Sequence, residues 1–283
     1  MRIGKVLRPT SWSEAVGLYA SLPAALPTAG ATDLLLEMAR QPATPEAEAV
    51  TLIDLWGLPE CSQITIETDD VVVGCGVTHN QIIAEPGRDS ALDLLRMACL
   101  EIGSPQLRNR ATVVGNVVTA SPANDTISAL MALDASIIME SAEGRRELPI
   151  REFFTGFRTT ALQQSELVRA IRIPRWTTNT LGTWLKVGNR SSQAISVVHA
   201  GIVLGFDELT STVTRADLAI GSVSETITLS AAFRNDLVGR SLDTETASDA
   251  ARAAVNEIEP IDDIRASATY RRSVTETAVR RAL

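Results

Sequence analysis

The sequence contains few cysteines, and their number and spacing exclude several kinds of metal centre. Cys61, Cys75 and Cys99 are the only three among 283 residues, and they lie 14 and 24 residues apart. These spacings match no zinc or iron–sulfur pattern, and an odd number suits a disulfide framework poorly. We therefore expect reduced structural thiols and no metal site on this chain. If the chain transfers electrons, its metal clusters lie on other chains.

Long apolar runs and an excess of positive charge are also missing. The longest apolar stretch, at 195–206, is interrupted by His199 and two glycines, so no segment is predicted to span a membrane. The first nine residues lack the apolar core of a signal peptide, which predicts a cytoplasmic protein. The formal net charge is −8, and this argues against a nucleic-acid partner, because such binders concentrate lysine and arginine.

The length of the chain suggests two domains, because single hydrophobic cores rarely grow much beyond this size. The composition shifts at 174–182 to a threonine-rich stretch with one aromatic residue, Trp176. Such stretches often connect domains. We therefore predict a first domain over 1–176 and a second over 177–283.

Helical and strand patterns alternate along the whole chain. Helices are expected at 9–22, 34–39, 91–102, 126–133, 247–258 and 267–283. Strands are expected at 24–28, 50–55, 64–68, 71–77, 135–140, 167–173, 184–187, 197–206 and 216–220. Asp125 is expected to cap the helix that follows it. The segments 42–48 and 104–116 are expected to be irregular.

A short turn, Ala29-Gly30-Ala31-Thr32-Asp33, lies between an expected strand and an expected helix. Unpaired N–H groups at a helix start favour an anion, and Gly30 removes a side chain where a phosphate would approach. An ordinary turn has the same appearance. The Gly-x-Gly-x-x-Gly pattern of a Rossmann nucleotide site is absent from this turn.

A second candidate loop, Thr112-Val113-Val114-Gly115-Asn116, is more informative because of the residues that follow it. Thr112, Asn116, Ser121 and Asp125 place short polar groups in an otherwise apolar stretch. This combination suits a ligand with many hydroxyls and phosphates. A strand with a bulge at Gly115, followed by an ordinary helix cap at Asp125, would produce the same pattern.

Several ordered motifs over nearly the whole chain resemble the medium, FAD-binding subunit of the molybdenum hydroxylases, which include xanthine dehydrogenase and carbon monoxide dehydrogenase. The matching segments are 29–34 (AGATDL), 52–60 (LIDLWGLPE), 73–79 (VGCGVTH), 102–112 (IGSPQLRNRAT), 121–125 (SPAND), 186–190 (KVGNR) and 263–272 (DIRASATYRR). Ordered matches over this span are far more specific than any single loop.

The resemblance implies an α+β fold. A two-subdomain FAD-binding domain of the vanillyl-alcohol oxidase (PCMH) type is followed by a smaller α/β domain of the CO dehydrogenase flavoprotein type. Both loops would hold the FAD pyrophosphate through backbone amides, and Asp125 would hydrogen-bond toward the sugar–ribityl region. Ile102 and Val168 would pack beside the flavin. Lys186 would lie near the isoalloxazine, where a positive charge stabilises anionic reduced flavin, and Arg190 would add to that field.

Without the resemblance, the sequence around Lys186 predicts a solvated surface lysine. The resemblance implies no catalytic residue on this chain. The cofactor-binding residues that it implies are Pro27, Thr28, Ala29, Gly30, Ala31, Thr32, Asp33, Leu34, Ile102, Ala111, Thr112, Val113, Val114, Gly115, Asn116, Ser121, Asp125, Val168 and Lys186.

The chain departs from the family at one position in each loop. Ala31 and Val114 stand where the family usually has glycine. If Val114 needs a positive φ, a β-branched residue there costs about 1–2 kcal/mol. Its side chain would then also meet the pyrophosphate. Weakened flavin binding is therefore expected at Val114 more than at Ala31.

The resemblance also implies a division of labour among subunits. A large molybdopterin-binding subunit oxidises the substrate, and a small [2Fe–2S] subunit passes electrons singly to FAD on this chain. NAD⁺ or another acceptor then receives them, and two three-chain units form a dimer. Two other functions remain open: a self-contained flavoprotein oxidase, or a flavin-free assembly subunit. An oxidase needs an acid or base, but His79 and His199 lie in apolar strand patterns that are typical of structural residues.

Overall fold

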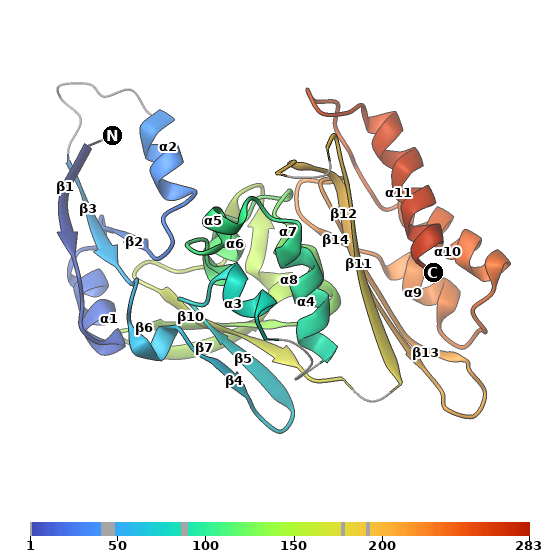
Figure 1. Ribbon diagram of the computed structural model, residues 1–283, viewed down its shortest axis with the longest axis horizontal. Helices are drawn as coiled ribbons and strands as arrows, with labels where there is room; N and C mark the ends of the chain where they lie inside the picture. The colour runs from blue at the N-terminus through green and yellow to red at the C-terminus, as the bar shows by residue number, and fades with distance from the viewer. Residues whose placement is uncertain (1, 41–48, 86–89, 177–178, 191–192) are drawn as a thin grey trace.

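The computed structural model contains three larger sheets in a row, with helices between and beside them, and one two-stranded hairpin (Figure 1). It describes residues 2–40, 49–85, 90–176, 179–190 and 193–283. The expected loop at 42–48 and residue 177, where the second domain is expected to begin, lie outside the described residues. No described helix is long and apolar enough to cross a membrane.

The first sheet is parallel and small, in the order β1-β3-β2. Its elements are β1 (Arg2–Leu7), α1 (Trp12–Ser21), β2 (Leu26–Thr28), α2 (Leu34–Arg40) and β3 (Ala49–Asp54). The side chain of Ser11 accepts from the amide of Glu14 and so starts α1. Because β2 and β3 are parallel, their carboxyl ends lie together, and the turn at 29–33 leaves the sheet at that edge.

The second sheet is antiparallel, in the order β4-β5-β10-β6-β7. Its strands are β4 (Ile64–Ile66), β5 (Asp70–Gly74), β6 (Ser136–Ser141), β7 (Gly144–Pro149) and β10 (Leu167–Pro174). The expected hairpin at 64–77 is confirmed by the β4–β5 pairing. The short helices that accompany this sheet are η1 (Pro59–Cys61), α3 (His79–Ile83), α4 (Ser90–Leu100), α5 (Pro105–Arg108), α6 (Val113–Val118), α7 (Asp125–Ala132) and α8 (Ile150–Phe153). A separate hairpin consists of β8 (Phe154–Gly156) and β9 (Thr159–Thr160).

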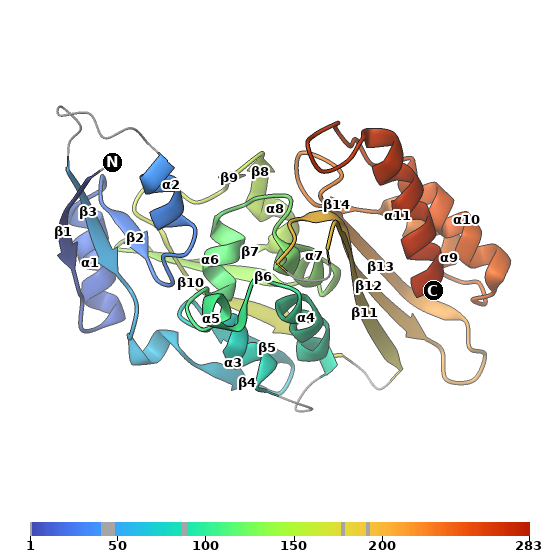
Figure 2. The ribbon, with the colours of Figure 1, turned by 45° about the horizontal axis from the view of Figure 1, so that its top comes forward.

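The third sheet lies between two layers of helix, as Figure 2 shows. Its strands, in spatial order, are β11 (Thr180–Gly188), β12 (Ser196–Phe206), β13 (Val213–Gly221) and β14 (Thr228–Leu229). The outer helices are α9 (Ala231–Leu237), α10 (Thr244–Val255) and α11 (Ala268–Ala282). On the inner side, α4 packs on β11 and α7 packs on β12 and β13. Because both faces are covered, β12 is buried at all but its last residue, which explains its continuous apolar run.

Two expectations for the region 104–125 are wrong. The segment 104–116 is not irregular, because it contains α5 and α6. Asp125 does not cap the next helix: the cap position is Asn124, whose side chain makes no capping hydrogen bond. Asp125 is the first residue of α7, and its carboxylate binds groups on the third sheet instead.

Candidate functional site

The first expected phosphate loop lies, backbone to backbone, against the residues that lead into the second. Loop one is the turn at 29–33, and loop two is the segment 112–116, which includes the start of α6. A Cβ atom on Gly30 would lie 2.1 Å from the carbonyl oxygen of Arg110 and 3.1 Å from the Cα of Ala111. Only glycine therefore permits this approach at residue 30.

A cavity of about 420 Å³ opens where the two loops meet. Most of the residues expected to hold the cofactor share this cavity. The expected residues in its wall are 27–34, Ile102, Ala111, Thr112, Gly115 and Asn116. The wall also contains residues that no cofactor prediction included, namely Glu37, His79, Leu107, Val118, Thr119 and Arg158.

A smaller apolar pocket of about 180 Å³ adjoins the cavity, since Thr28, Ala29, Thr112 and Gly115 line both. Val114 and Val168, two further expected residues, belong to this pocket. The rest of its wall comes from Tyr19, Pro27, Leu55, Cys75, Val118, Leu162, Glu166 and Leu167. The two spaces together form a cleft with a polar and an apolar part. Such a cleft suits a ligand that combines phosphates with flat rings.

Loop one presents unpaired polar groups to this cleft. Within the described residues, the amide N–H groups of Gly30, Ala31 and Thr32 donate to no acceptor in the chain. The Thr28 hydroxyl is buried and has no partner there either. Buried polar groups normally have a partner, and a row of free amides favours an anion. The donors and the space of the cleft therefore fit the pyrophosphate and sugars of FAD.

The two departures from the family's glycines differ in their consequences. Ala31 has a φ of 62°, in the left-handed region, where a residue with a Cβ is strained by about 1 kcal/mol. Val114 has no positive φ, because it lies in α6, and its side chain is buried beside the apolar pocket. The strain expected at Val114 is therefore found at Ala31 instead.

The charged side chains of the cavity wall are Asp33, Glu37 and Arg158. Arg158 lies in the turn between β8 and β9 and forms an ion pair with Glu37 of α2. The Thr119 hydroxyl donates to the Asp33 carboxylate at 3.1 Å. Each carboxylate of the described wall thus has a partner within the chain, which reduces its repulsion of a bound phosphate.

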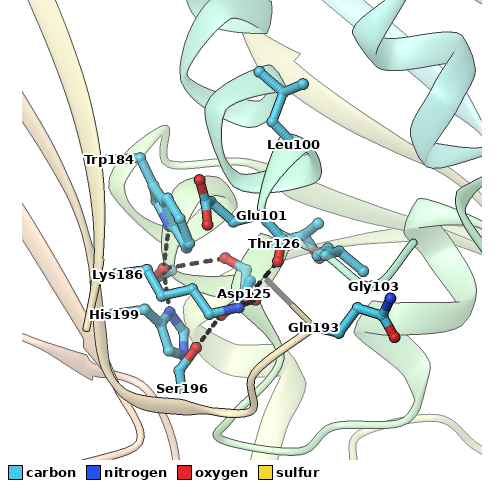
Figure 3. Close-up of polar contacts among 12 residues, drawn as sticks. Leu100, Glu101, Gly103, Asp125, Thr126, Trp184, Lys186, Gln193, Ser196 and His199 are labelled. Atoms are coloured by element: carbon cyan, nitrogen blue, oxygen red, sulfur yellow. Dashed lines mark hydrogen bonds and ion pairs between the residues drawn. The ribbon is translucent and has the colours of Figure 1, made fainter. Parts of the chain in front are cut away.

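A buried ion pair joins α7 to the third sheet (Figure 3). The Nζ atom of Lys186 on β11 lies 2.7 Å from Oδ2 of Asp125, and their side chains are only 8% and 7% exposed. Lys186 also donates to the carbonyl oxygen of Glu101 at 3.1 Å. The Ser196 hydroxyl donates to the second oxygen of Asp125 at 2.5 Å. These contacts exclude the interpretation of Lys186 as a solvated surface lysine.

Lys186 supports two walls of the cofactor cavity. The carbonyl group that it binds immediately precedes Ile102, which lines the cavity. Its carboxylate partner immediately precedes Thr126, whose hydroxyl donates to Oδ1 of Asn116 in loop two at 2.5 Å. The position of one lysine therefore affects an apolar wall and a phosphate loop together.

Four expected cofactor residues lie outside the walls of both the cavity and the apolar pocket. They are Val113, Ser121, Asp125 and Lys186. Val113 is fully buried, and its amide donates to the carbonyl of Val77 at 3.0 Å. Ser121 accepts a hydrogen bond from the amide of Ala123.

The two histidines differ in their surroundings. His199 lies on β12, with Nδ1 2.7 Å from the Ser128 hydroxyl and Nε2 3.1 Å from the Pro122 carbonyl. Burial lowers the pKa of His199 below its usual value. His79 is the first residue of α3 and not part of a strand, and it lines the cofactor cavity. The expectation of a strand at His79 is therefore wrong.

Comparison with known families agrees with this geometry. Residues 2–176 match the family described as "FAD binding domain in molybdopterin dehydrogenase". The chain belongs to this family. Residues 183–283 match a second family, the "CO dehydrogenase flavoprotein C-terminal domain". The resemblance, the α+β fold and FAD as the cofactor are thus confirmed.

Individual relatives cover between about two thirds and nearly all of the chain. The carbon monoxide dehydrogenase medium chain of Hydrogenophaga pseudoflava is 32% identical over 276 residues, which are 97% of this chain and 94% of the relative. The nicotinate dehydrogenase FAD-subunit of Eubacterium barkeri is 34% identical over 206 residues, 71% of this chain and 68% of the relative. A solved structure of carbon monoxide dehydrogenase from Hydrogenophaga pseudoflava has a TM-score of 0.91 at 30% identity, with 99% of this chain and 96% of that chain covered.

Proposed function

We propose that this chain holds one FAD in the cleft between loop one and loop two, as the electron-transfer subunit of a three-subunit molybdenum hydroxylase. The cleft is the observation that carries the proposal, because loop one, with amides that have no acceptor in the described chain, lines its polar part, and apolar side chains line much of the rest. Bound FAD supplies a two-electron station between a [2Fe–2S] subunit and NAD⁺ or another acceptor. Substrate oxidation belongs to a large molybdopterin-binding subunit, and two three-chain units form a dimer.

The residues of the chain bind and orient the cofactor in this proposal. The amides of loop one and loop two hold the pyrophosphate, while Ile102 and Val168 form apolar walls. Asp125 and Lys186 lie outside the walls of the cleft and would act from behind them, Asp125 toward the sugar–ribityl region and Lys186 as a positive charge near the isoalloxazine. The ion pair between these two residues keeps that charge in place.

The proposal includes a domain boundary at 176/177 and a cytoplasmic location. The two family matches, which end at 176 and begin at 183, support a boundary in this region. The location is supported by Cys61, Cys75 and Cys99, which are all free and buried. Free thiols persist in reducing compartments.

Purification of the complete complex tests the proposal. The chain is isolated with its partner subunits, and the visible spectrum is recorded before and after the cofactor is released with acid. We expect a yellow complex that yields one FAD per copy of this chain. An active complex whose copies of this chain contain no flavin would contradict the proposal, and oxidation of a small substrate by the chain alone would favour a self-contained oxidase.

A further inference from the structure

One buried histidine in the cofactor cavity has two unpaired ring nitrogens. His79 is only 1% exposed, yet within the described part of the chain neither Nδ1 nor Nε2 has a hydrogen-bond partner. Its neighbours in the cavity wall include Ile102, Leu107 and Thr112. His199 is equally buried, but each of its ring nitrogens has a partner. Burial therefore does not explain the unpaired state of His79, and its place at the cavity does.

The backbone of His79 is held firmly beside loop two. Its amide donates to the carbonyl of Ala111 at 3.1 Å, and Thr78 pairs with Thr112 in an isolated β-bridge. Thr78 and Gln81 form a capping box that fixes the start of α3. These backbone contacts set the position of the imidazole without using its nitrogens. The described chain therefore uses neither nitrogen, and His79 lines the cavity, so a ring nitrogen can serve a group bound there.

We propose that His79 is a cofactor-positioning residue whose imidazole hydrogen-bonds a sugar hydroxyl of bound FAD, on the ribityl chain or the ribose. The inference rests on the proposed function, because it assigns a further residue to the same cleft. A ring nitrogen of a neutral imidazole is either a donor or an acceptor, and a hydroxyl can complement whichever of the two faces it. A phosphate accepts only, and the free amides of loop one already supply its donors.

The charge state of His79 favours a hydroxyl over a phosphate. Burial, assisted by the guanidinium of Arg108, lowers the pKa of His79 to about 4. The ring is therefore neutral near pH 7. Arg108 is itself held by Oδ1 of Asn80 and by the carbonyls of Leu100 and Ile102. This arrangement keeps a positive charge close to His79, which opposes protonation of the ring.

The chain has only two histidines, so nuclear magnetic resonance can observe His79 directly. The full chain is prepared free of flavin with ¹³C-labelled histidine rings, and FAD is added to saturation while its fluorescence reports binding. The His79→Gln variant identifies the His79 signal by its absence. We expect the His79 signal to shift on FAD binding while the His199 signal stays in place. An unchanged His79 signal at saturation, as a buried water on the ring would produce, overturns the inference.

Affinity provides a second measurement. We expect His79→Leu to weaken FAD binding about tenfold, the effect of losing one buried hydrogen bond. His79→Gln keeps a donor and an acceptor, so we expect it to stay within about threefold of the parent chain. Equal affinities of the Leu and Gln variants and the parent chain overturn the inference. If His79→Leu does not fold, the response of the His79 resonance signal to FAD in the unaltered chain still tests the inference.

The two proposals can fail separately. If the unaltered chain binds no FAD, alone or within its complex, the proposed function fails and the role of His79 fails with it. If FAD binds and the His79 signal does not respond, only the role of His79 fails. Lumiflavin lacks the sugar hydroxyls of FAD. A His79 signal that shifts with FAD but not with lumiflavin supports both the proposed function and the role of His79.

Discussion

Loop one and loop two face the same cleft but are stabilised differently. The Thr112 side chain caps α6 by accepting from the amide of Gly115 at 3.0 Å, and Asn116 is held by Thr126. Loop one has free amides and a strained Ala31, and it approaches loop two through Gly30. In loop two the amides of Val113, Gly115 and Asn116 therefore have acceptors within the described chain, whereas those of Gly30, Ala31 and Thr32 in loop one have none.

The largest effect on FAD affinity is expected from Gly30→Ala. The added Cβ would lie 2.1 Å from the Arg110 carbonyl oxygen, so loop one must move away from residues 110 and 111, which lead into loop two. We expect FAD affinity to fall by at least about a hundredfold, because the free amides lose their position against loop two. Fluorescence titration measures this change, with circular dichroism to monitor folding. Gly17→Ala in α1 is the matched control, since its Cβ would meet nothing within 4 Å. Parent-like affinity of Gly30→Ala would show that the loops do not depend on this contact.

Lys186→Met tests the support of loop two. It leaves the buried Asp125 carboxylate without its counter-charge, which typically destabilises a protein by about 3–5 kcal/mol. Urea unfolding measures the change in the free energy of unfolding. The double variant Asp125→Asn, Lys186→Met removes both charges, and we expect it to lose less stability than the single variant. A single variant as stable as the parent would mean that the ion pair does not support this region.

Lowering the pH should reduce the stability of the folded chain, because His79 beside loop two becomes protonated. The pKa of His79 is about 4 in the folded chain and about 6.5 in an ordinary histidine, so the unfolded chain binds the proton more readily between these values. The free energy of unfolding therefore falls as the pH drops from 6.5 toward 4, by about 3 kcal/mol for this group. Urea midpoints at several pH values measure the slope. His79→Gln cannot titrate and should show a shallower slope; an identical slope would contradict the assignment.

The smallest effect is expected from Ala31→Gly. Glycine accepts the φ of 62° without strain, and we expect a gain in stability of up to about 1 kcal/mol, partly offset by the greater freedom of glycine in the unfolded chain. Thermal unfolding measures it. Val114→Gly introduces the other family glycine, but it removes a buried side chain from a helix and should lower stability. Changes of the same sign in both variants would contradict the contrast between the loops.

The sequence was sufficient for most of the longer helices and strands, although it gave no sign of β1, β7 or α9. The apolar run at 197–206 predicted a buried strand, and β12 occupies it because helices cover both faces of the sheet. The motifs around loop one and loop two predicted the residues that meet in the cavity. Motifs succeed here because each loop is a local structure whose residues are adjacent in the chain.

Short helices and contacts between distant segments could not be predicted. Helices α5 and α6 have four and six residues, too few to show an apolar period. Asp125 has the residue type of a helix cap, but Lys186 and Ser196 from the third sheet bind its carboxylate instead. Arg158 reaches the cavity from a hairpin whose sequence carries no ligand motif.

The link between Lys186 and Asp125 limits how this protein can be recombined. The two residues lie on opposite sides of the expected domain boundary, and Ser196 joins them from the same side as Lys186. A chimera that takes its two halves from different members of the family inherits a matched carboxylate and ammonium only if both parents have them. Exchange of the C-terminal half alone, to change partners or acceptors, should therefore preserve all three residues.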